Sequence, residues 1–182
     1  MNSESVSNFK AKRVTRRYVQ TIDAEPSVVH ALICPVKEAE WLEGWDYDLI
    51  YSQSGVAEYG CVFTSNSAGE ETIWLITKRD DVAFETEFAR VSPGSRVALV
   101  AVQIEDGGHQ TSRVHISYTI TALNAAGNAF VDSFTQENFV NDMRFWEASM
   151  NHYLNTGKAL PQYDTEHWLN YGADQSTPKE DR

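Results

Sequence analysis

The sequence predicts an α+β protein in which a curved, seven-stranded antiparallel sheet wraps around a long helix near the C-terminus. Three observations support this prediction: six consecutive runs with strand spacing, a long helical stretch after them, and gaps too short for crossover helices. At 182 residues the chain has the length of one domain, and its 42% hydrophobic residues are ordinary for a globular protein.

The chain begins with an expected strand over residues 13–22, where β-branched and polar residues alternate. Two short helices are expected next, over 27–33 and 36–42. Pro26 fits the first turn of the first helix, and Pro35 separates the two. Both helices therefore lie between the first and second strands.

The spacing then changes from helical to alternating. The six strand-like runs are expected near residues 45–53, 58–65, 71–79, 82–91, 95–105 and 111–122. Every gap carries turn residues, as in Ser92-Pro93-Gly94, and such short connections join antiparallel neighbours. The sequence therefore predicts a meander.

A single long helix is expected over residues 128–155, with Gly157 as its C-cap. It is the only element large enough to cover one face of the sheet. The predicted organisation is a flexible arm over 1–12, one domain over 13–157 and a tail over 158–182 that is disordered at its end.

Several segments resemble a known superfamily. They are Cys34–Trp45, Ser54-Gly55 followed by Gly60–Phe63, and Trp146 with Tyr153–Gly157. Together they resemble the START/Bet v 1-like superfamily, also called SRPBCC, over residues 13–157. This resemblance implies the helix-grip fold. Members include lipid and hormone binders, polyketide cyclases and dehydratases, ubiquinone-binding proteins and Hsp90-ATPase activators, so the fold does not select one activity.

A sheet curled around a helix encloses a hollow, which predicts binding of a small hydrophobic or aromatic molecule such as a lipid, isoprenoid or polyketide-like compound. Strand alternation and one helical stripe indicate several residues that face this hollow, although the register of Trp74 stays open. Trp41 and Trp45 are candidates for its mouth, where they either stack on a ligand or anchor a loop to the sheet edge. The predicted ligand-binding residues are Trp41, Trp45, Phe63, Trp74, Phe84, Phe88, Tyr118, Asp132, Thr135, Gln136, Phe139, Met143 and Trp146.

The start of the long helix allows two interpretations. The stripe through Phe139 continues toward the N-terminus into Asp132, Thr135 and Gln136, which are polar. Either these residues point into the cavity, or this side of the helix start is solvated and the tail covers the nearby phenylalanines. Only the first interpretation makes them part of a site.

Two other functions are compatible with the pattern. A cyclase or dehydratase would need an acid or base in the cavity, and Asp132 and Tyr118 are the candidates. A protein-interaction domain of the Hsp90-activator kind would use exposed Phe130 and Phe134 and the strand at 73–76, which is apolar on both faces. These features also fit a homodimer.

Other functions are disfavoured. The net charge of −11 opposes nucleic-acid binding, and no segment is long and apolar enough to span a membrane. The polar N-terminus lacks a secretion signal, so we expect a cytoplasmic protein. His30, Cys34 and Glu38 are spaced by four, but Pro35 interrupts their helix, so no metal is expected. No nucleotide-binding motif or hydrolytic triad is found, and we expect no cofactor.

Overall fold

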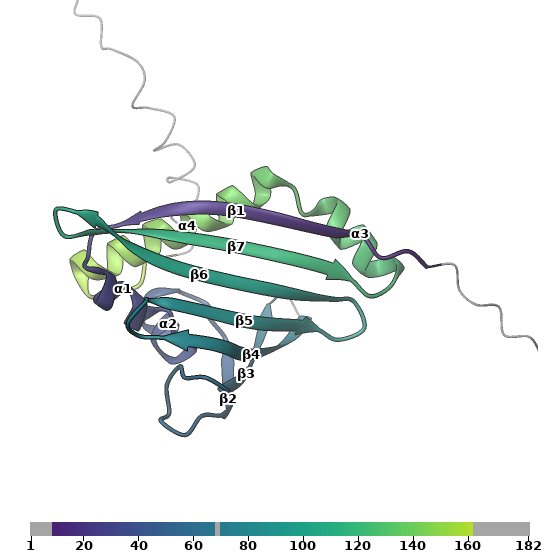
Figure 1. The fold of residues 1–182 in the computed structure, drawn as a ribbon, viewed down its shortest axis with the longest axis horizontal. Coiled ribbons are helices and arrows are strands. Elements are labelled where there is room, and N and C mark those ends of the chain that lie inside the picture. The colour runs from purple at the N-terminus through teal and green to yellow at the C-terminus, as the bar shows by residue number, and fades with distance from the viewer. Residues whose placement is uncertain (1–8, 68–69, 162–182) are drawn as a thin grey trace, which may run out of the picture.

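The computed structural model describes residues 9–67 and 70–161 and contains one seven-stranded sheet with four helices (Figure 1). The strands are β1 (Arg13–Ile22), β2 (Tyr47–Tyr51), β3 (Val62–Ser67), β4 (Glu70–Asp80), β5 (Glu85–Ser92), β6 (Arg96–Gly108) and β7 (Thr111–Ala122). The helices are α1 (Pro26–Leu32), α2 (Pro35–Trp41), α3 (Ala125–Ser133) and α4 (Gln136–Thr156).

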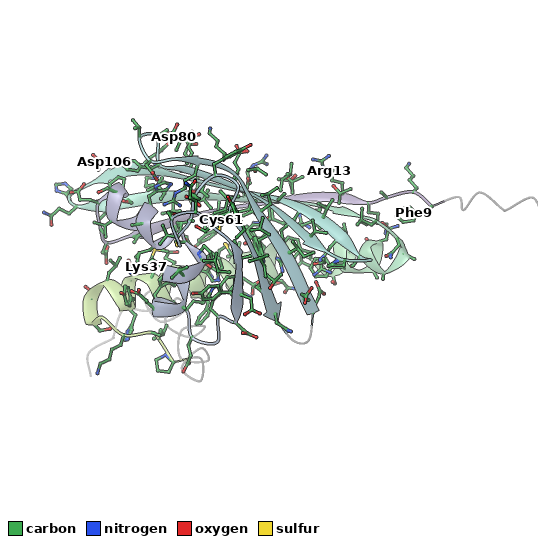
Figure 2. All side chains as sticks on the ribbon, turned by 90° about the horizontal axis from the view of Figure 1, so that it is seen from below. Phe9, Arg13, Lys37, Cys61, Asp80 and Asp106 are labelled. Carbon is green, nitrogen blue, oxygen red and sulfur yellow. The ribbon has the colours of Figure 1, made fainter. Side chains whose placement is uncertain are left out.

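The strand order is β1-β7-β6-β5-β4-β3-β2, and every neighbouring pair is antiparallel. Strands β2 to β7 therefore form the predicted meander, and β1 joins its far edge beside β7. Figure 1 shows α4 lying along one side of the sheet, with α1 and α2 at one end of the strands and α3 at the other. Arg13 and Asp106 mark these opposite ends in Figure 2.

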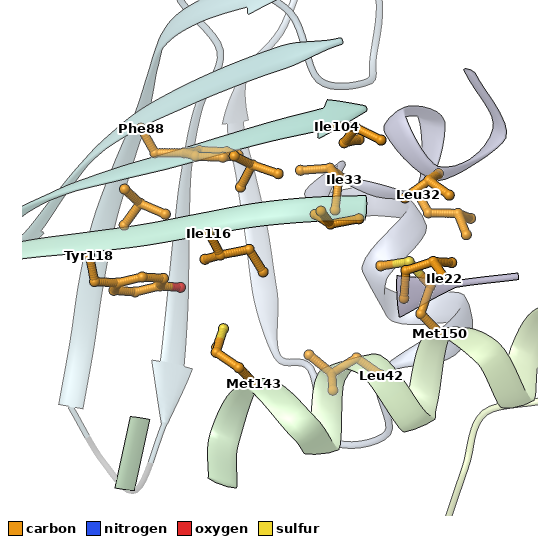
Figure 3. Close-up of a cluster of buried hydrophobic side chains, with 14 of the residues drawn as sticks. Ile22, Leu32, Ile33, Leu42, Phe88, Ile104, Ile116, Tyr118, Met143 and Met150 are labelled. Carbon is orange, nitrogen blue, oxygen red and sulfur yellow. The ribbon is translucent and has the colours of Figure 1, made fainter. Parts of the chain in front are cut away.

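Alternation along each strand separates the two faces of the sheet. In β7, Val114, Ile116 and Tyr118 are buried against α4 and the short helices. In β4, whose register the sequence leaves open, Trp74 and Ile76 face inward and leave Ile73 and Leu75 partly exposed on the outer face. The inward side chains form one continuous core between the sheet and α4 (Figure 3).

The expected single long helix is two helices. Phe134 and Thr135 separate α3 from α4, and the Thr135 side chain accepts a hydrogen bond from the Asn138 backbone N–H as the N-cap of α4. Helix α3 packs across the end of the sheet, where Val131 joins a second, smaller core with Ala98, Ile120 and Ala122. Phe130 and Phe134 pack against this cluster instead of forming an exposed face.

The C-terminal end of α1 is attached to the sheet by Arg79 of β4. Its guanidinium donates hydrogen bonds to the carbonyls of His30, at 2.9 Å, and Ile33, at 2.7 Å, and to the Thr86 hydroxyl at 3.1 Å. The Arg79 cation thus gives the Ile33 carbonyl a partner and adds a second donor to the His30 carbonyl, which also accepts from the Ile33 backbone N–H. It fixes α1 and the start of α2 relative to β4 and β5.

Contacts with the core also involve residues just outside 13–157 at both ends. Leu160 is buried and forms a parallel bridge with Leu42, so the chain past Gly157 still contributes to the core. At the other end, the Lys12 backbone N–H donates to the Asn128 side chain at 2.8 Å. The rest of the predicted arm and tail, residues 1–8 and 162–182, lies outside the described residues.

Candidate functional site

A small pocket lies in the interior between the sheet, α2 and α4. Its volume is about 20 Å³, which is room for about one water molecule. The residues that line it are Ile33, Glu38, Trp45, Phe63, Trp74, Phe88, Val100, Val102, Ile116, Tyr118 and Trp146. The wall is therefore mainly aliphatic and aromatic, with two ionisable side chains.

The sheet side of the pocket is a fixed aromatic surface. Phe63 and Trp74 face each other across the β3–β4 pair and stack with ring centroids 5.5 Å apart. The Phe88 ring meets Trp74 edge-on at 5.9 Å. The Trp74 indole N–H donates to the Ser65 hydroxyl at 2.8 Å, which satisfies its only polar atom and holds the ring in place.

The helix side of the pocket contains two half-buried tryptophans. Trp45, which follows α2, donates its indole N–H to the Pro35 carbonyl at 2.9 Å. Trp146 of α4 lies edge-on against buried Trp41, with ring centroids 5.7 Å apart. Because Trp45 and Trp146 are half-buried while the sheet-side rings are buried, this side of the pocket is the side nearer to solvent.

Glu38 brings an acid into this apolar wall. Its side chain is only 6% exposed, and burial raises the pKa of the Glu38 carboxyl to about 8. No hydrogen bond or ion pair reaches this carboxyl from any residue within 9–67 or 70–161. Burying a polar group without a hydrogen-bond partner destabilises the folded protein. A carboxyl kept in this position beside a pocket therefore indicates a role other than stability.

Tyr118 supplies a second polar group from the opposite wall. Figure 3 shows its ring reaching from β7 into the space above Met143 of α4. Burial raises the pKa of Tyr118 to about 12, and the positive charge of nearby Arg90 offsets part of this increase. The part of the chain that the structure describes offers no hydrogen-bond partner to the Tyr118 hydroxyl. The pocket thus holds two protonated oxygen groups at neutral pH.

Arg90 lies on the inner face of the sheet beside the pocket but does not line it. Its guanidinium is 4.9 Å from the centroid of the Trp74 ring, a cation–π contact. Its Nε atom is buried and has no hydrogen-bond partner among the residues that the structure describes. Arg90 therefore places a positive charge beside Trp74, close enough to lower the pKa of Tyr118 in part.

The structure brings six of the predicted residues together at the pocket: Trp45, Phe63, Trp74, Phe88, Tyr118 and Trp146. Three others, Trp41, Phe139 and Met143, are buried core residues that pack around these without lining the hollow. Phe84 is not in a strand, because β5 begins at Glu85. Phe84 sits in the preceding turn and packs edge-on against His30.

Asp132, Thr135 and Gln136 do not face the pocket, so this part of the prediction is wrong. Asp132 is exposed and forms an ion pair with Lys12 at 2.6 Å. Thr135 caps α4, and the Gln136 side chain donates to the Arg17 carbonyl at 3.1 Å on the protein surface. The break between α3 and α4 rotates these positions away from the stripe through Phe139.

The sequence-based prediction omitted five of the residues that line the pocket: Ile33, Val100, Val102, Ile116 and Glu38. Glu38 is the polar one of the five. It was weighed only as a metal ligand, together with His30 and Cys34. The available signal was its spacing of three from Pro35 and from Trp41, which places all three on the buried face of α2. Among the described residues, no group of three or more His, Cys, Asp or Glu side chains could hold a metal ion.

A larger hollow of about 370 Å³ lies on the outer face of the sheet, over β1, β5, β6 and β7. Strand residues such as Arg17, Glu87, Gln103 and His115 line it, and it is open to solvent. It lacks the enclosed apolar wall typical of small-molecule sites. The interior pocket is therefore the candidate site.

No family model matches this sequence, and no curated protein matches it. Solved structures do match. Ara h 8.0201 superposes with a TM-score of 0.60 at 12% identity, covering 80% of this chain and 99% of that one. This chain has the helix-grip fold of the START/Bet v 1-like superfamily.

Two enzymes share this helix-grip fold. The Zhui aromatase/cyclase from Streptomyces sp. R1128 has a TM-score of 0.60 at 10% identity, covering 83% of this chain and all of that one, 100%. Norcoclaurine synthase from Thalictrum flavum, in complex with dopamine and hydroxybenzaldehyde, has a TM-score of 0.60 at 11% identity, covering 86% and 95%. For the first match found, a putative protein of the dynemicin biosynthetic locus, this chain spans only 48% of the length.

No helix among the described residues is long and apolar enough to cross a membrane.

Proposed function

We propose that this protein binds a small hydrophobic or aromatic molecule in the interior pocket. The observation that supports this most directly is the enclosure of a hollow by six aromatic side chains, with two polar groups that have no hydrogen-bond partner within residues 9–67 and 70–161. Apolar walls with a few polar groups are typical of small-molecule sites. Lipids, isoprenoids and polyketide-like compounds all present the apolar surface that such a wall favours.

A ligand larger than one water needs the pocket to widen. The sheet side is held by the Phe63–Trp74 stack and the hydrogen bond to Ser65. The half-buried rings of Trp45 and Trp146 are less enclosed, so their displacement costs less packing. Ligand entry therefore takes place from the helix side, with Trp146 as the principal moving residue.

Binding can be tested with aminoanthracene, a neutral ring compound whose fluorescence rises in apolar surroundings. We expect saturable binding with one probe per chain. Val100→Phe fills the pocket from the sheet side and should weaken binding at least about tenfold. The matched control is Leu99→Phe, because Leu99 is the next residue along β6 and is 56% exposed on the outer face, whereas Val100 is 3% exposed.

Two results would contradict the proposal. If the wild-type chain shows no saturable binding of aminoanthracene, the proposed function is wrong. Equal binding by wild-type protein and by a folded Val100→Phe variant would place the probe somewhere other than this pocket. Circular dichroism and urea unfolding of both variants establish that each is folded, since extra volume in a core commonly costs about 1–3 kcal/mol.

An acid–base enzyme is the second candidate, and Glu38 is the observation that favours it. A carboxyl with a pKa of about 8 can exchange a proton at neutral pH inside an apolar pocket. In deuterated buffer, the ionised carboxylate would remove a proton from the methyl group of acetylnaphthalene, and a deuteron would replace it. Protein-dependent loss of the methyl proton signal, abolished in Glu38→Gln, would support an enzyme. No exchange above the buffer rate would oppose it.

A further inference from the structure

We propose that Glu38 and Tyr118 together hold a carbonyl oxygen of the ligand, so that the ligand is an apolar ring compound carrying a neutral hydrogen-bond acceptor. This inference rests on the proposed function and specifies the chemistry of the same pocket. Its basis is that the two unpartnered oxygen groups at the pocket come from opposite walls, α2 and β7.

The first step is that both groups act as donors. A neutral carboxyl has one O–H donor, and so has a phenol. Burial keeps Glu38 protonated at neutral pH and keeps Tyr118 protonated throughout the physiological range. Two donors directed at one hollow are complementary to an acceptor with two lone pairs, which a carbonyl oxygen provides.

The second step is that the protein itself leaves both groups unsatisfied. Glu38 is 6% exposed and Tyr118 is 7% exposed, so neither has free access to bulk water. Within the described chain, no hydrogen bond reaches either side-chain oxygen. By contrast, nearby Trp74 and Trp45 both have partners for their N–H groups, at 2.8 and 2.9 Å. Unlike Trp74 and Trp45, the two acids therefore have no side-chain hydrogen-bond partner within the described residues. The Nε atom of Arg90 also has none there, but Arg90 does not line the pocket.

The third step concerns the charged groups around the pair. Arg90 of β5 is paired with Trp74 of β4, and its charge reaches Tyr118, but Arg90 does not line the pocket. Asp142 of α4 has its pKa raised by partial desolvation. The neighbours of Glu38 on α2 are Lys37 and Glu40, which pair with each other at the surface. A ligand carboxylate would therefore lie in an apolar pocket with no cation among its lining residues, which is unfavourable.

The experiment compares three probes that share one ring system, measured by displacement of aminoanthracene. Acetylnaphthalene has a carbonyl acceptor, isopropenylnaphthalene replaces that oxygen by a carbon of similar shape, and naphthoate replaces it by an anion. We expect acetylnaphthalene to bind about tenfold more tightly than isopropenylnaphthalene, since unpaired buried donors oppose the hydrocarbon. Naphthoate should bind least well.

Variants test the roles of the two residues. Tyr118→Phe and Glu38→Leu should each reduce the preference for the carbonyl probe about fivefold or more and leave isopropenylnaphthalene binding largely unchanged. Glu38→Gln keeps an N–H donor and should retain most of the preference. The matched control is Glu40→Gln, two residues along on the exposed side of α2, which should behave as wild type.

A pH series gives a readout independent of folding defects. In the wild type, the preference for the carbonyl probe should fall as the pH rises through about 8, because ionised Glu38 is no longer a donor. In Glu38→Gln, the preference should stay constant over the same range. A pH-independent wild-type preference would overturn the role of Glu38 even if Glu38→Leu failed to fold.

The failures of the two proposals are distinguishable. If none of the ring compounds displaces aminoanthracene, and aminoanthracene itself does not bind, the proposed function fails. If the carbonyl and hydrocarbon probes bind equally, the pocket binds apolar rings and the donor pair is wrong. If naphthoate binds best, the site recognises an anion through Arg90, and the proposed ligand class is wrong.

Discussion

The two ends of the space beneath the sheet are packed in different ways. At the α3 end, small residues bring helix and sheet into close contact: a Cβ atom at Gly127 would lie 2.1 Å from the Ser95 carbonyl oxygen and 3.1 Å from Ala122. At the α2 end, large rings such as Phe63, Trp74 and Trp146 surround a hollow.

The difference shows what makes a core receptive to a ligand. Small side chains such as Ala98 and Ala122 let backbones approach until no volume remains. Rigid rings leave irregular space between them. At the α3 end the cap of the helix is also satisfied, since the Asn124 side chain accepts from the Gly127 N–H at 2.9 Å. At the α2 end, the described part of the chain offers no such partner to the polar groups of Glu38 and Tyr118.

The largest expected effect comes from breaking the close contact. Gly127→Ala should reduce the free energy of unfolding by about 3 kcal/mol, because the clash is with backbone atoms that cannot turn aside. Urea unfolding measures this loss. Ala126→Ser, on the exposed side of the same turn, is the control and should change stability by less than about 0.5 kcal/mol. Unchanged stability of Gly127→Ala would show that α3 can lift from the sheet freely.

The second-largest expected effect is a pH-dependent change in stability caused by Glu38 at the α2 end. The pKa of Glu38 is raised in the folded state, so folding favours its protonated form. Its contribution to stability is complete below the usual carboxyl range and is lost as the pH rises through about 8. Between about pH 5 and about pH 8, we expect the wild type to lose about 3 kcal/mol relative to Glu38→Gln.

His30 also makes stability depend on pH, with the opposite sign to Glu38. Taking the difference in stability between wild type and Glu38→Gln removes the contribution of His30. Burial lowers the pKa of His30, so its contribution is present above its usual pKa and is lost as the pH falls. This contribution is common to both proteins and cancels. Parallel stability curves for wild type and Glu38→Gln would contradict burial of an uncompensated acid at position 38.

The smallest effect belongs to Asp132, which the sequence favoured as a cavity acid. Its ion pair with Lys12 is exposed, with 59% of the Asp132 side chain accessible. Asp132→Asn should change the free energy of unfolding by less than about 1 kcal/mol and leave aminoanthracene affinity unchanged. A clear loss of aminoanthracene affinity in Asp132→Asn would show that the α3–α4 junction belongs to the binding site.

The fold was predictable because its signals are local. Turn residues such as Ser92-Pro93-Gly94 mark each hairpin, and β-strand alternation in residues 111–122 identifies the inward face. The same alternation indicated Phe88 and Tyr118, and the helical stripe indicated Trp146, but the register of Trp74 could not be read from the sequence. The predicted strand limits differ from the observed ones mainly at their ends, where hydrogen bonding rather than pattern decides.

The errors arose where a pattern was extended through a break. The stripe through Phe139 was continued into Asp132 as if one helix covered both, but Thr135 begins a new helix with a different direction. Glu38 was missed for another reason. A glutamate in a short helix is usually solvated, and only the positions of α4 and β7 relative to α2 show that this one is enclosed.

The guanidinium of Arg79 has a consequence for how this protein could diversify. It holds the carbonyl of Ile33, whose side chain lines the hollow, although Arg79 itself lies outside it. A lysine could not reproduce the forked hydrogen bonds to α1 and Thr86. A substitution at residue 79 can therefore change the shape of the pocket by shifting α1 and Ile33. Ligand preference can change in this way while every residue that contacts the ligand stays the same.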